Sequence, residues 1–409
     1  MSLYDQPDRP AARPRLPPGI WALGFVSMLM DISSEMIHAL LPVYLVGALG
    51  ASTLAVGFIE GIAEATASIT KVFSGALSDW LGRRKLLAAI GYGLAAFTKP
   101  VFPLAGTVGW VVAARFVDRI GKGIRGAPRD ALIADLAPPG QRGAAFGLRQ
   151  SLDTAGAFIG PLIAIGLMAA SGGDIRMVFW WAVLPAFGAF ALIVLAVHDV
   201  PHAAADKPRA PLSRAELARL PAAYWWVVGV SAVFTVARFS EAFLVLRAQE
   251  LGVALSLIPA VLVLMNTVYS LASYPVGLLA DRVHRGTLLV LGVTLLVAAD
   301  LALALVGGLA GLALGVALWG LHMGMTQGLL AALVADAAPP SLRGTAFGVF
   351  NLAGGVALLL ASALAGGLWD AFGSRATFVC GAAFAALSLA GFGLLGLRGM
   401  LQQNISPKL

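Results

Sequence analysis

A seventeen-residue motif occurs twice in the chain, and this repeat constrains the fold more than any other feature of the sequence. The segment ALIADLAPPGQRGAAFG at 131–147 returns as ALVADAAPPSLRGTAFG at 332–348, an offset of 201 residues with twelve positions identical. In each copy a hydrophobic helix ends after an Asp, a Pro-Pro pair prevents its continuation, and an Arg-Gly turn leads into the next apolar helix. A repeat at half the chain length predicts a molecule built from two similar halves.

The composition predicts that lipid is the solvent of both halves. Of the 409 residues, 59% are hydrophobic and 12% are charged, whereas a soluble domain carries about 25% charged residues. Apolar runs of about 20 residues, long enough to cross a bilayer core of about 30 Å, recur along the chain. We therefore predict an all-α polytopic membrane protein with two pseudo-symmetric six-helix bundles. Its twelve transmembrane helices are expected at 19–46, 52–78, 86–106, 109–134, 143–170, 177–197, 222–249, 253–280, 287–307, 309–335, 343–369 and 375–398.

Breaks in the hydrophobicity divide the chain into five parts. The first bundle is predicted at 19–197 and the second at 222–398. The basic, proline-containing segment 198–221 between them is expected to be a cytoplasmic linker. Residues 1–18, with five prolines, are typical of a disordered cytoplasmic tail and not of a cleaved signal, and 399–409 form a second tail.

The basic residues of the loops predict the orientation in the membrane. Sixteen Lys and Arg residues fall on the side of the termini and three on the other side. The positive-inside rule therefore places both termini in the cytoplasm and the protein in the inner, or cytoplasmic, membrane. Because this distribution accounts for the net charge of +7, no nucleic-acid partner is expected. The single cysteine, Cys380, excludes a disulfide framework and a thiolate metal cluster.

A second repeated segment resembles a known family. Gly75-Ala-Leu-Ser-Asp79-Trp-Leu-Gly-Arg83-Arg84 lies between spans 2 and 3, and a copy with Asp281 lies between spans 8 and 9. The first copy resembles the cytoplasmic loop signature of the major facilitator superfamily, with Trp80 at a position that is usually basic. The resemblance implies a conformational latch between the halves, to which we assign Gly75, Asp79, Arg83, Arg142, Asp281 and Arg343.

A glycine pattern in span 5 bears on the direction of transport. Gly147, Gly156, Gly160 and Pro161 resemble the helix 5 signature of antiporters in this superfamily, although Ala164 replaces its last glycine. The pattern has no counterpart after Gly348 in the second half. Closely packing glycines beside a proline suit a bending or sealing element, while ordinary glycine packing is the alternative.

Charged residues inside the spans are candidates for function because each costs roughly 2.5–3.5 kcal/mol to insert. Most of them lie in the first half, and at the offset of 201 Arg115 and Asp118 correspond to Val316 and Trp319. A purely structural role would predict similar charges in both halves. The first half is therefore expected to hold the ion-coupling chemistry, and the second half a more neutral wall with Trp319, His322, Gln327 and Asn351.

Four acidic residues are the candidates for proton coupling: Asp31, Glu35, Glu64 and Asp153. By the resemblance, the span that carries Asp31 and Glu35 lines the central cavity, where carboxyl groups can take up and release protons. Permanent ion pairs with the basic residues of span 4 are the alternative. Asp153 is expected to pair with Arg115 or Arg119, and Glu60 is placed too near the outer end of its span for a role.

The substrate-binding candidates of the first half are His38, Arg115, Asp118, Arg119 and Lys122. The basic residues either neutralise the neighbouring carboxylates or attract an anionic substrate. Asp31, Glu35 and His38 share one helix face and offer ligands that suit a divalent cation, but the nearby positive charges oppose this. No resident metal or cofactor is therefore expected.

The sequence predicts a transporter and not an enzyme, since it lacks a phosphate loop, a nucleophile elbow and a metal-hydrolase motif. We expect a monomer in the lipid bilayer that exchanges protons for a small-molecule substrate by alternating access, that is, proton-coupled efflux. Proton-coupled uptake of an anionic solute and efflux of a divalent metal or metal chelate are alternatives. A membrane receptor or assembly factor without transport is a further one.

Overall fold

The computed structural model of the chain describes residues 16–81, 83–138, 141–199, 217–280, 283–339 and 342–397. Helices make up almost all of these ranges, and none of their residues is in a strand. The two predicted tails and most of the predicted linker lie outside the described residues.

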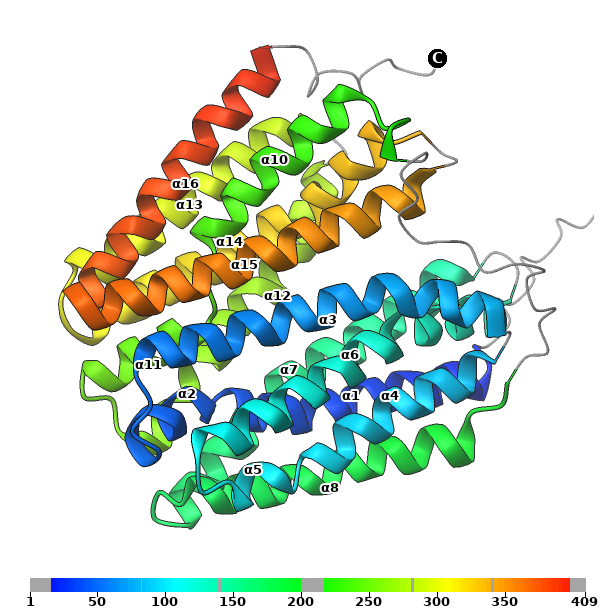
Figure 1. The fold of residues 1–409 in the computed structure, drawn as a ribbon, viewed down its shortest axis with the longest axis horizontal. Helices are drawn as coiled ribbons and strands as arrows, with labels where there is room; N and C mark the ends of the chain where they lie inside the picture. The colour runs from blue at the N-terminus through cyan, green and yellow to red at the C-terminus, as the bar shows by residue number, and fades with distance from the viewer. Residues whose placement is uncertain are drawn as a thin grey trace, which may run out of the picture.

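The first half begins with α1 (Pro18–His38), which α2 (Leu41–Val43) and the π-helical η1 (Tyr44–Ala48) continue. The remaining helices follow in antiparallel order (Figure 1). They are α3 (Thr53–Leu81), α4 (Arg84–Thr98) with α5 (Val101–Leu104), α6 (Val108–Leu136), α7 (Arg142–Ala170) and α8 (Ile175–Ala196).

The second half repeats this pattern. Its helices are α10 (Ala222–Ala237), α11 (Ala242–Glu250), the 3-10 turn η2 (Leu255–Leu257), α12 (Ala260–Ala280), α13 (Arg285–Leu305), α14 (Gly308–Ala337), α15 (Arg343–Phe372) and α16 (Ser374–Leu397). Ten crossing segments of the described chain are long and apolar enough to span a membrane, and α3 and α6, which carry most intramembrane charges, complete the twelve. The prediction of an all-α, twelve-helix membrane protein is confirmed.

Three crossing segments of the described chain are broken within the bundle, and two of these breaks follow the repeat. The first lies at Ala39–Leu40 between α1 and α2, and residues 238–241 between α10 and α11 are its counterpart near the offset of 201. The third lies at Lys99–Pro100, where proline cannot continue the hydrogen bonds of α4. Residues 238–241, Arg-Phe-Ser-Glu, contain neither glycine nor proline.

The two halves meet mainly along α3 and α15 (Figure 1). We call the end of the bundle where α1 begins and α8 ends the terminal end, and the other the far end. Close approach requires glycine here, because a Cβ atom at Gly57 would lie 2.0 Å from the carbonyl oxygen of Ser362. At the far end, the Asp370 carboxylate of α15 accepts hydrogen bonds from the backbone N–H of Thr53 at 3.0 Å and of Leu54 at 2.9 Å. One half thus caps the first turn of a helix in the other.

Candidate functional site

Two ion pairs link α3 and α6 inside the first half. Arg115 donates to Glu60 at 2.7 Å, and both side chains are almost fully buried. One turn along, Arg119 contacts Glu64 at 3.0 Å. The sequence prediction for Glu60 was wrong. This carboxylate lies in the core of the half, where it satisfies the guanidinium that was expected to serve a substrate.

A third buried ion pair involves a lysine that the sequence analysis passed over. Lys99 donates to Asp118 at 3.0 Å and to the Ser34 hydroxyl at 3.2 Å, and it is 1% exposed. It lies at the break between α4 and α5, immediately before Pro100. Asp118, a predicted substrate-binding residue, is held in this buried pair, and its role in substrate binding stays a prediction. A lysine-proline pair inside a predicted span was the available signal.

His38 joins the coupling candidates of α1 to these pairs. Its Nδ1 lies 3.6 Å from Glu35, and its Nε2 lies 3.7 Å from Glu60. The side chain of Glu35 is 25% exposed, whereas that of Glu60 is 2% exposed. A continuous row of polar groups therefore runs from the partly accessible Glu35 through His38 and Glu60 to Arg115.

Asp31 lines a cavity of about 190 Å³ between α1, α7 and α12. Among the described residues no cation forms an ion pair with it. Asp153 also lines this cavity, but its partner is Arg149 at 2.5 Å, four residues earlier on α7. The predicted pairing of Asp153 with Arg115 or Arg119 was wrong, since those cations are held by α3.

The other half contributes polar groups to the same cavity, from α12. The Asn266 side chain donates to the backbone oxygen of Ala157 at 3.4 Å, a hydrogen bond between the halves. Tyr269 and Ser270 lie beside it, and the Tyr269 hydroxyl donates to Gln327 at 3.3 Å. A site with carboxyls on one side and neutral hydrogen-bonding groups on the other can bind a polar or charged solute.

The glycines of α7 pack against the face of α1 that carries the coupling candidates. A Cβ atom at Gly156 would lie 3.0 Å from the Cβ of Asp31, and one at Gly160 would lie 2.9 Å from the Cβ of Glu35. At Gly147 a Cβ would meet no atom within 4 Å. The antiporter-like pattern therefore brings α7 into direct contact with both carboxyl-bearing turns.

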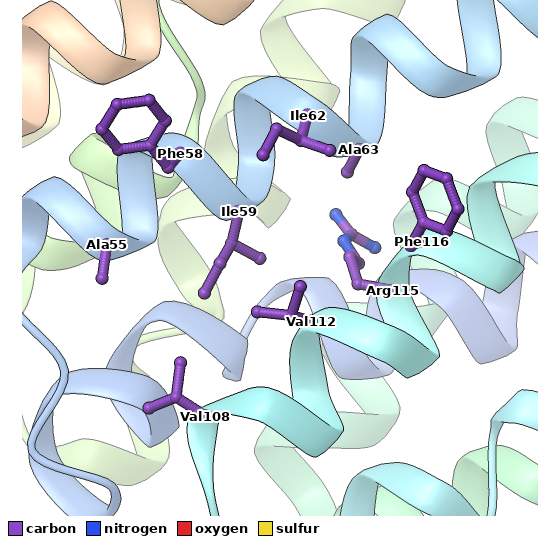
Figure 2. A pocket seen from close by; sticks show the side chains of 9 residues that line it. All are labelled: Ala55, Phe58, Ile59, Ile62, Ala63, Val108, Val112, Arg115 and Phe116. Carbon is purple, nitrogen blue, oxygen red and sulfur yellow. The ribbon is translucent and has the colours of Figure 1, made fainter.

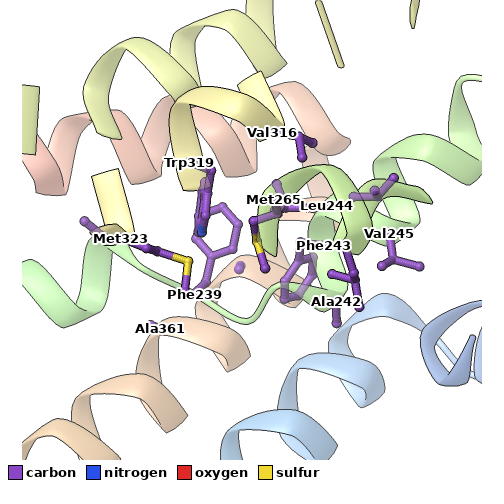
Figure 3. Packing of buried hydrophobic residues seen from close by; sticks show 14 of the residues in the cluster. Phe239, Ala242, Phe243, Leu244, Val245, Met265, Val316, Trp319, Met323 and Ala361 are labelled. Carbon is purple, nitrogen blue, oxygen red and sulfur yellow. The ribbon is translucent and has the colours of Figure 1, made fainter. Parts of the chain in front are cut away.

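Two predicted wall residues of the second half do not line the cavity. Trp319 is 1% exposed and His322 0% exposed. Figure 3 shows Trp319 packed beside Phe239, with Met323 nearby, in a core of apolar side chains. His322 packs against Phe234 of α10 and Gly292 of α13, and the role of both residues in substrate binding stays a prediction. Gln327 is exposed and Asn351 is half-buried, so both remain candidates.

Other predicted site residues are exposed or lie outside the described residues. Lys122 has a side chain 49% exposed, beside Glu64 at 3.9 Å. Of the latch, Gly75 packs near Ala127 and Arg83 is exposed. Outside the described residues lie Asp281 and the side chains of Asp79, Arg142 and Arg343.

Arg115 also forms the base of a second pocket, which lies on the outer surface of the bundle. This crevice of about 310 Å³ lies between α3 and α6 and is otherwise apolar (Figure 2). Its rim residues Phe58 and Phe116 are 45% and 42% exposed, as lipid-facing side chains would be. Because Arg115 is committed to Glu60, we do not assign a polar ligand to this crevice.

Glu241 is a further residue that sequence reasoning left without a role. It precedes α11, at the break in the second half. A charged residue within a predicted membrane span was a usable signal.

Comparison with known proteins decides the family. The family model of the Major Facilitator Superfamily matches residues 23–362. The chain belongs to the major facilitator superfamily. An uncharacterized MFS-type transporter of Methanocaldococcus jannaschii is 31% identical over 90% of this chain and 92% of its own length. The quinolone resistance protein NorA of Staphylococcus aureus is 28% identical over 44% of this chain and 45% of its own length.

Solved structures agree on the fold. A POT family transporter in complex with a thioalcohol-conjugated peptide superimposes with a TM-score of 0.79 at 13% identity, over 93% of this chain and 96% of the other. The protein is thus a multi-pass membrane transporter, of a superfamily that transports and does not catalyse reactions.

Proposed function

We propose that the protein exports a small solute in exchange for protons, as a monomer in the cytoplasmic membrane with both termini in the cytoplasm. The observation that supports this best is Asp31. It faces a cavity shared by both halves, without a cation paired to it among the described residues. A carboxyl group in such a place can be neutralised by a proton or by a cationic group of a substrate, and the two then compete.

The contacts between the halves favour one conformational state. Toward the far end, Gly366 of α15 packs on Thr53 and Leu54, and Gly61 of α3 packs on Leu359. The far end is thus sealed, and the positive-inside rule makes the terminal end cytoplasmic. We interpret this state as inward-facing.

The coupling follows from these positions. In the outward-facing state, Asp31 and Glu35 take up protons and the substrate leaves. In the inward-facing state the protons leave toward the cytoplasm, and a new substrate binds beside the carboxylates that have lost them. His38 transmits the charge of Glu35 to Glu60, so the Glu60–Arg115 pair senses whether Glu35 is protonated. Glu64, close to Lys122 and Arg119, is a further proton-coupling candidate.

Proton-coupled uptake of an anionic solute is the second candidate function. Lys122 supports it, because half of its side chain is open to the surroundings and its only ion-pair partner among the described residues is Glu64 at 3.9 Å. For metal efflux, the described residues contain no group of three ligands placed to hold an ion.

Substrate-dependent proton movement in proteoliposomes tests the proposal. A quinolone, a dipeptide and a wider compound panel are added to acid-loaded vesicles that contain the wild type, Asp31→Asn or Glu35→Gln. Proton release on addition of a compound, lost in both variants, would support antiport and name the substrate class. Proton movement into the interior together with an anion would support uptake instead. Flux without proton movement, equal in all three proteins, would contradict both.

A further inference from the structure

Asp300 of α13 is a buried acid that the mechanism above does not use. It is 0% exposed, and neither carboxyl oxygen has a hydrogen-bond partner among the described residues. Gly381 of α16 makes room for it, since a Cβ atom there would lie 2.6 Å from Oδ2 of Asp300. An ionised carboxylate in a protein core, without a hydrogen-bond donor or a cation from the protein, is strongly disfavoured. The carboxyl group must therefore be neutral in this conformation, with a proton of its own.

The repeat shows what the first half holds in the same place. At the offset of 201, Asp300 corresponds to Lys99, and Trp319 corresponds to Asp118. Lys99 and Asp118 neutralise each other as a buried ion pair at 3.0 Å. The second half has an acid in place of the lysine and an indole in place of its partner. A proton is the cation that remains available to Asp300.

Few ionisable groups surround this carboxyl. From α16, Cys380 immediately precedes Gly381, which packs against the carboxyl. From α14, Trp319 is uncharged, and His322 lies one turn on with its Nδ1 at the backbone oxygen of Gly292, 3.3 Å away.

The break between α10 and α11 contributes two charged residues, Arg238 and Glu241. The Arg238 guanidinium lies over the Phe234 ring at 5.8 Å. Glu241 is the N-cap residue of α11. Neither forms an ion pair with Asp300 among the described residues, so a permanent salt bridge does not account for the acid.

Phe239 from this break covers the site. A Cβ atom at Gly381 would lie 2.9 Å from Cε1 of Phe239 as well as 2.6 Å from Asp300, so the ring and the carboxyl meet at one point. The ring also packs against Trp319, with centroids 5.4 Å apart. Because residues 238–241 are not helical, they can move without disrupting a complete helix, and their movement would uncover the acid.

We propose that Asp300 is a proton-binding site of the second half, which carries a proton in this conformation and exchanges it when residues 238–241 withdraw Phe239. The role in transport rests on the proton-coupled function proposed above, whereas the protonation itself does not. The site would add a proton to the cycle from the half of the molecule that is otherwise poor in charge.

Infrared spectroscopy of the full-length protein in lipid nanodiscs tests the protonation at neutral pH. Asp300→Asn keeps the shape of the side chain and should remove the intensity of one protonated carboxyl from the C=O stretching region. Asp130→Asn, in which a carboxylate paired with Arg129 is removed, is the matched control and should remove none. A band of unchanged intensity in Asp300→Asn would overturn the proposal.

A second variant keeps the test valid if Asp300→Asn does not fold. Gly381→Ala places a methyl group against Oδ2 and should shift the frequency of the same band. If the band shifts, it belongs to Asp300; if it keeps its frequency in a folded Gly381→Ala protein, the assignment fails.

Exchange into D₂O tests the gating by Phe239. Cysteines at Thr53 and Asp370, in a Cys380→Ser background, allow a thiol crosslinker to hold the far end closed. The Asp300 band should exchange at least about tenfold more slowly in the crosslinked protein than after cleavage of the linker. Equal rates would overturn the gating.

Neither spectrum needs a transported substrate, so the two proposals can fail separately. If vesicles show no proton movement but Asp300→Asn removes the band, the proton site stands and antiport falls. If protons move but the band is insensitive to Asp300→Asn, the proton site falls alone.

Discussion

The two halves share one helix pattern but fill equivalent core positions with different chemistry. Arg115 and Asp118 of α6 form buried ion pairs with Glu60 and Lys99, and Val316 and Trp319 occupy the matching positions of α14 within an apolar core. The comparison indicates that the scaffold itself needs no charge at these positions. The charges of the first half are therefore available for function.

The largest effect is expected for the buried ion pair of the first half, at a position where the second half has an apolar contact. Arg115→Met leaves the buried Glu60 with only the more distant His38, at 3.7 Å, which should lower the free energy of unfolding by about 3–5 kcal/mol. Val316→Ala at the matching position removes two methyl groups and should cost about 1.5 kcal/mol. Denaturation of the purified proteins in detergent compares the two.

The paired variant sharpens this prediction. Adding Glu60→Gln to Arg115→Met removes the unpaired charge and should restore most of the lost stability. If Arg115→Met costs no more than Val316→Ala, the pair contributes little and the contrast between the halves is not one of buried charge.

The glycine face of α7 should show a smaller effect of about 1–3 kcal/mol. Gly160→Ala would place a methyl group 2.8 Å from the backbone oxygen of Ile32, so α1 and α7 must separate. Gly147→Ala on the same helix meets no atom and should stabilise the protein slightly, because alanine is the better helix former. Equal melting temperatures for the two variants would show that α7 does not depend on close contact with α1.

The cap between the halves should shift the conformational equilibrium by about 1 kcal/mol, roughly a fivefold change in population. Asp370→Asn weakens the hydrogen bonds to Thr53 and Leu54 and should favour opening of the far end. Spin labels at the exposed residues Leu104 and Leu309, in a Cys380→Ser background, report the separation of the halves by electron resonance.

Asp174→Asn is the matched control for this prediction. Asp174 caps α8 within one half, accepting from the backbone N–H of Arg176 at 2.9 Å. Its replacement should cost a similar amount of stability but leave the label separation unchanged. A shift of the same size in both variants would argue against a role for Asp370 in holding the halves together.

The smallest effect is expected at an exposed ion pair. Arg247 contacts Glu250 at 2.8 Å, but the glutamate side chain is 44% exposed. Glu250→Gln should therefore change the unfolding free energy by less than about 0.5 kcal/mol. A loss comparable to that of Arg115→Met would mean that burial does not determine the strength of these pairs.

The fold could be predicted from the sequence because the signals that define it are local or repeated. Apolar runs of membrane-spanning length and the duplicated Ala-Pro-Pro segments define the helices without knowledge of their packing. The breaks after α1 and α10 were not predicted. The second of them leaves no signal in the sequence, because residues 238–241 contain no helix breaker.

The site could be predicted only in part, since depth and rotation of a helix depend on its neighbours. Spacing correctly grouped Asp31, Glu35 and His38 on one face, but it could not show that Glu60 would meet Arg115 from another helix. The same limit explains why Trp319, which was expected to line the cavity, lies in the apolar core. Contacts across hundreds of residues, such as Asp370 with Thr53, leave no local pattern.

The most direct test of the central claim separates proton coupling from substrate movement. Vesicles are loaded with a compound identified in the screen, and uptake of its labelled form is measured with and without a pH gradient. For Asp31→Asn and Glu35→Gln, we predict exchange without a gradient near the wild-type rate and loss of gradient-driven accumulation. Asp130→Asn should retain both activities. If either coupling variant still accumulates substrate against its gradient like the wild type, the first half does not couple protons through that residue and the account is wrong.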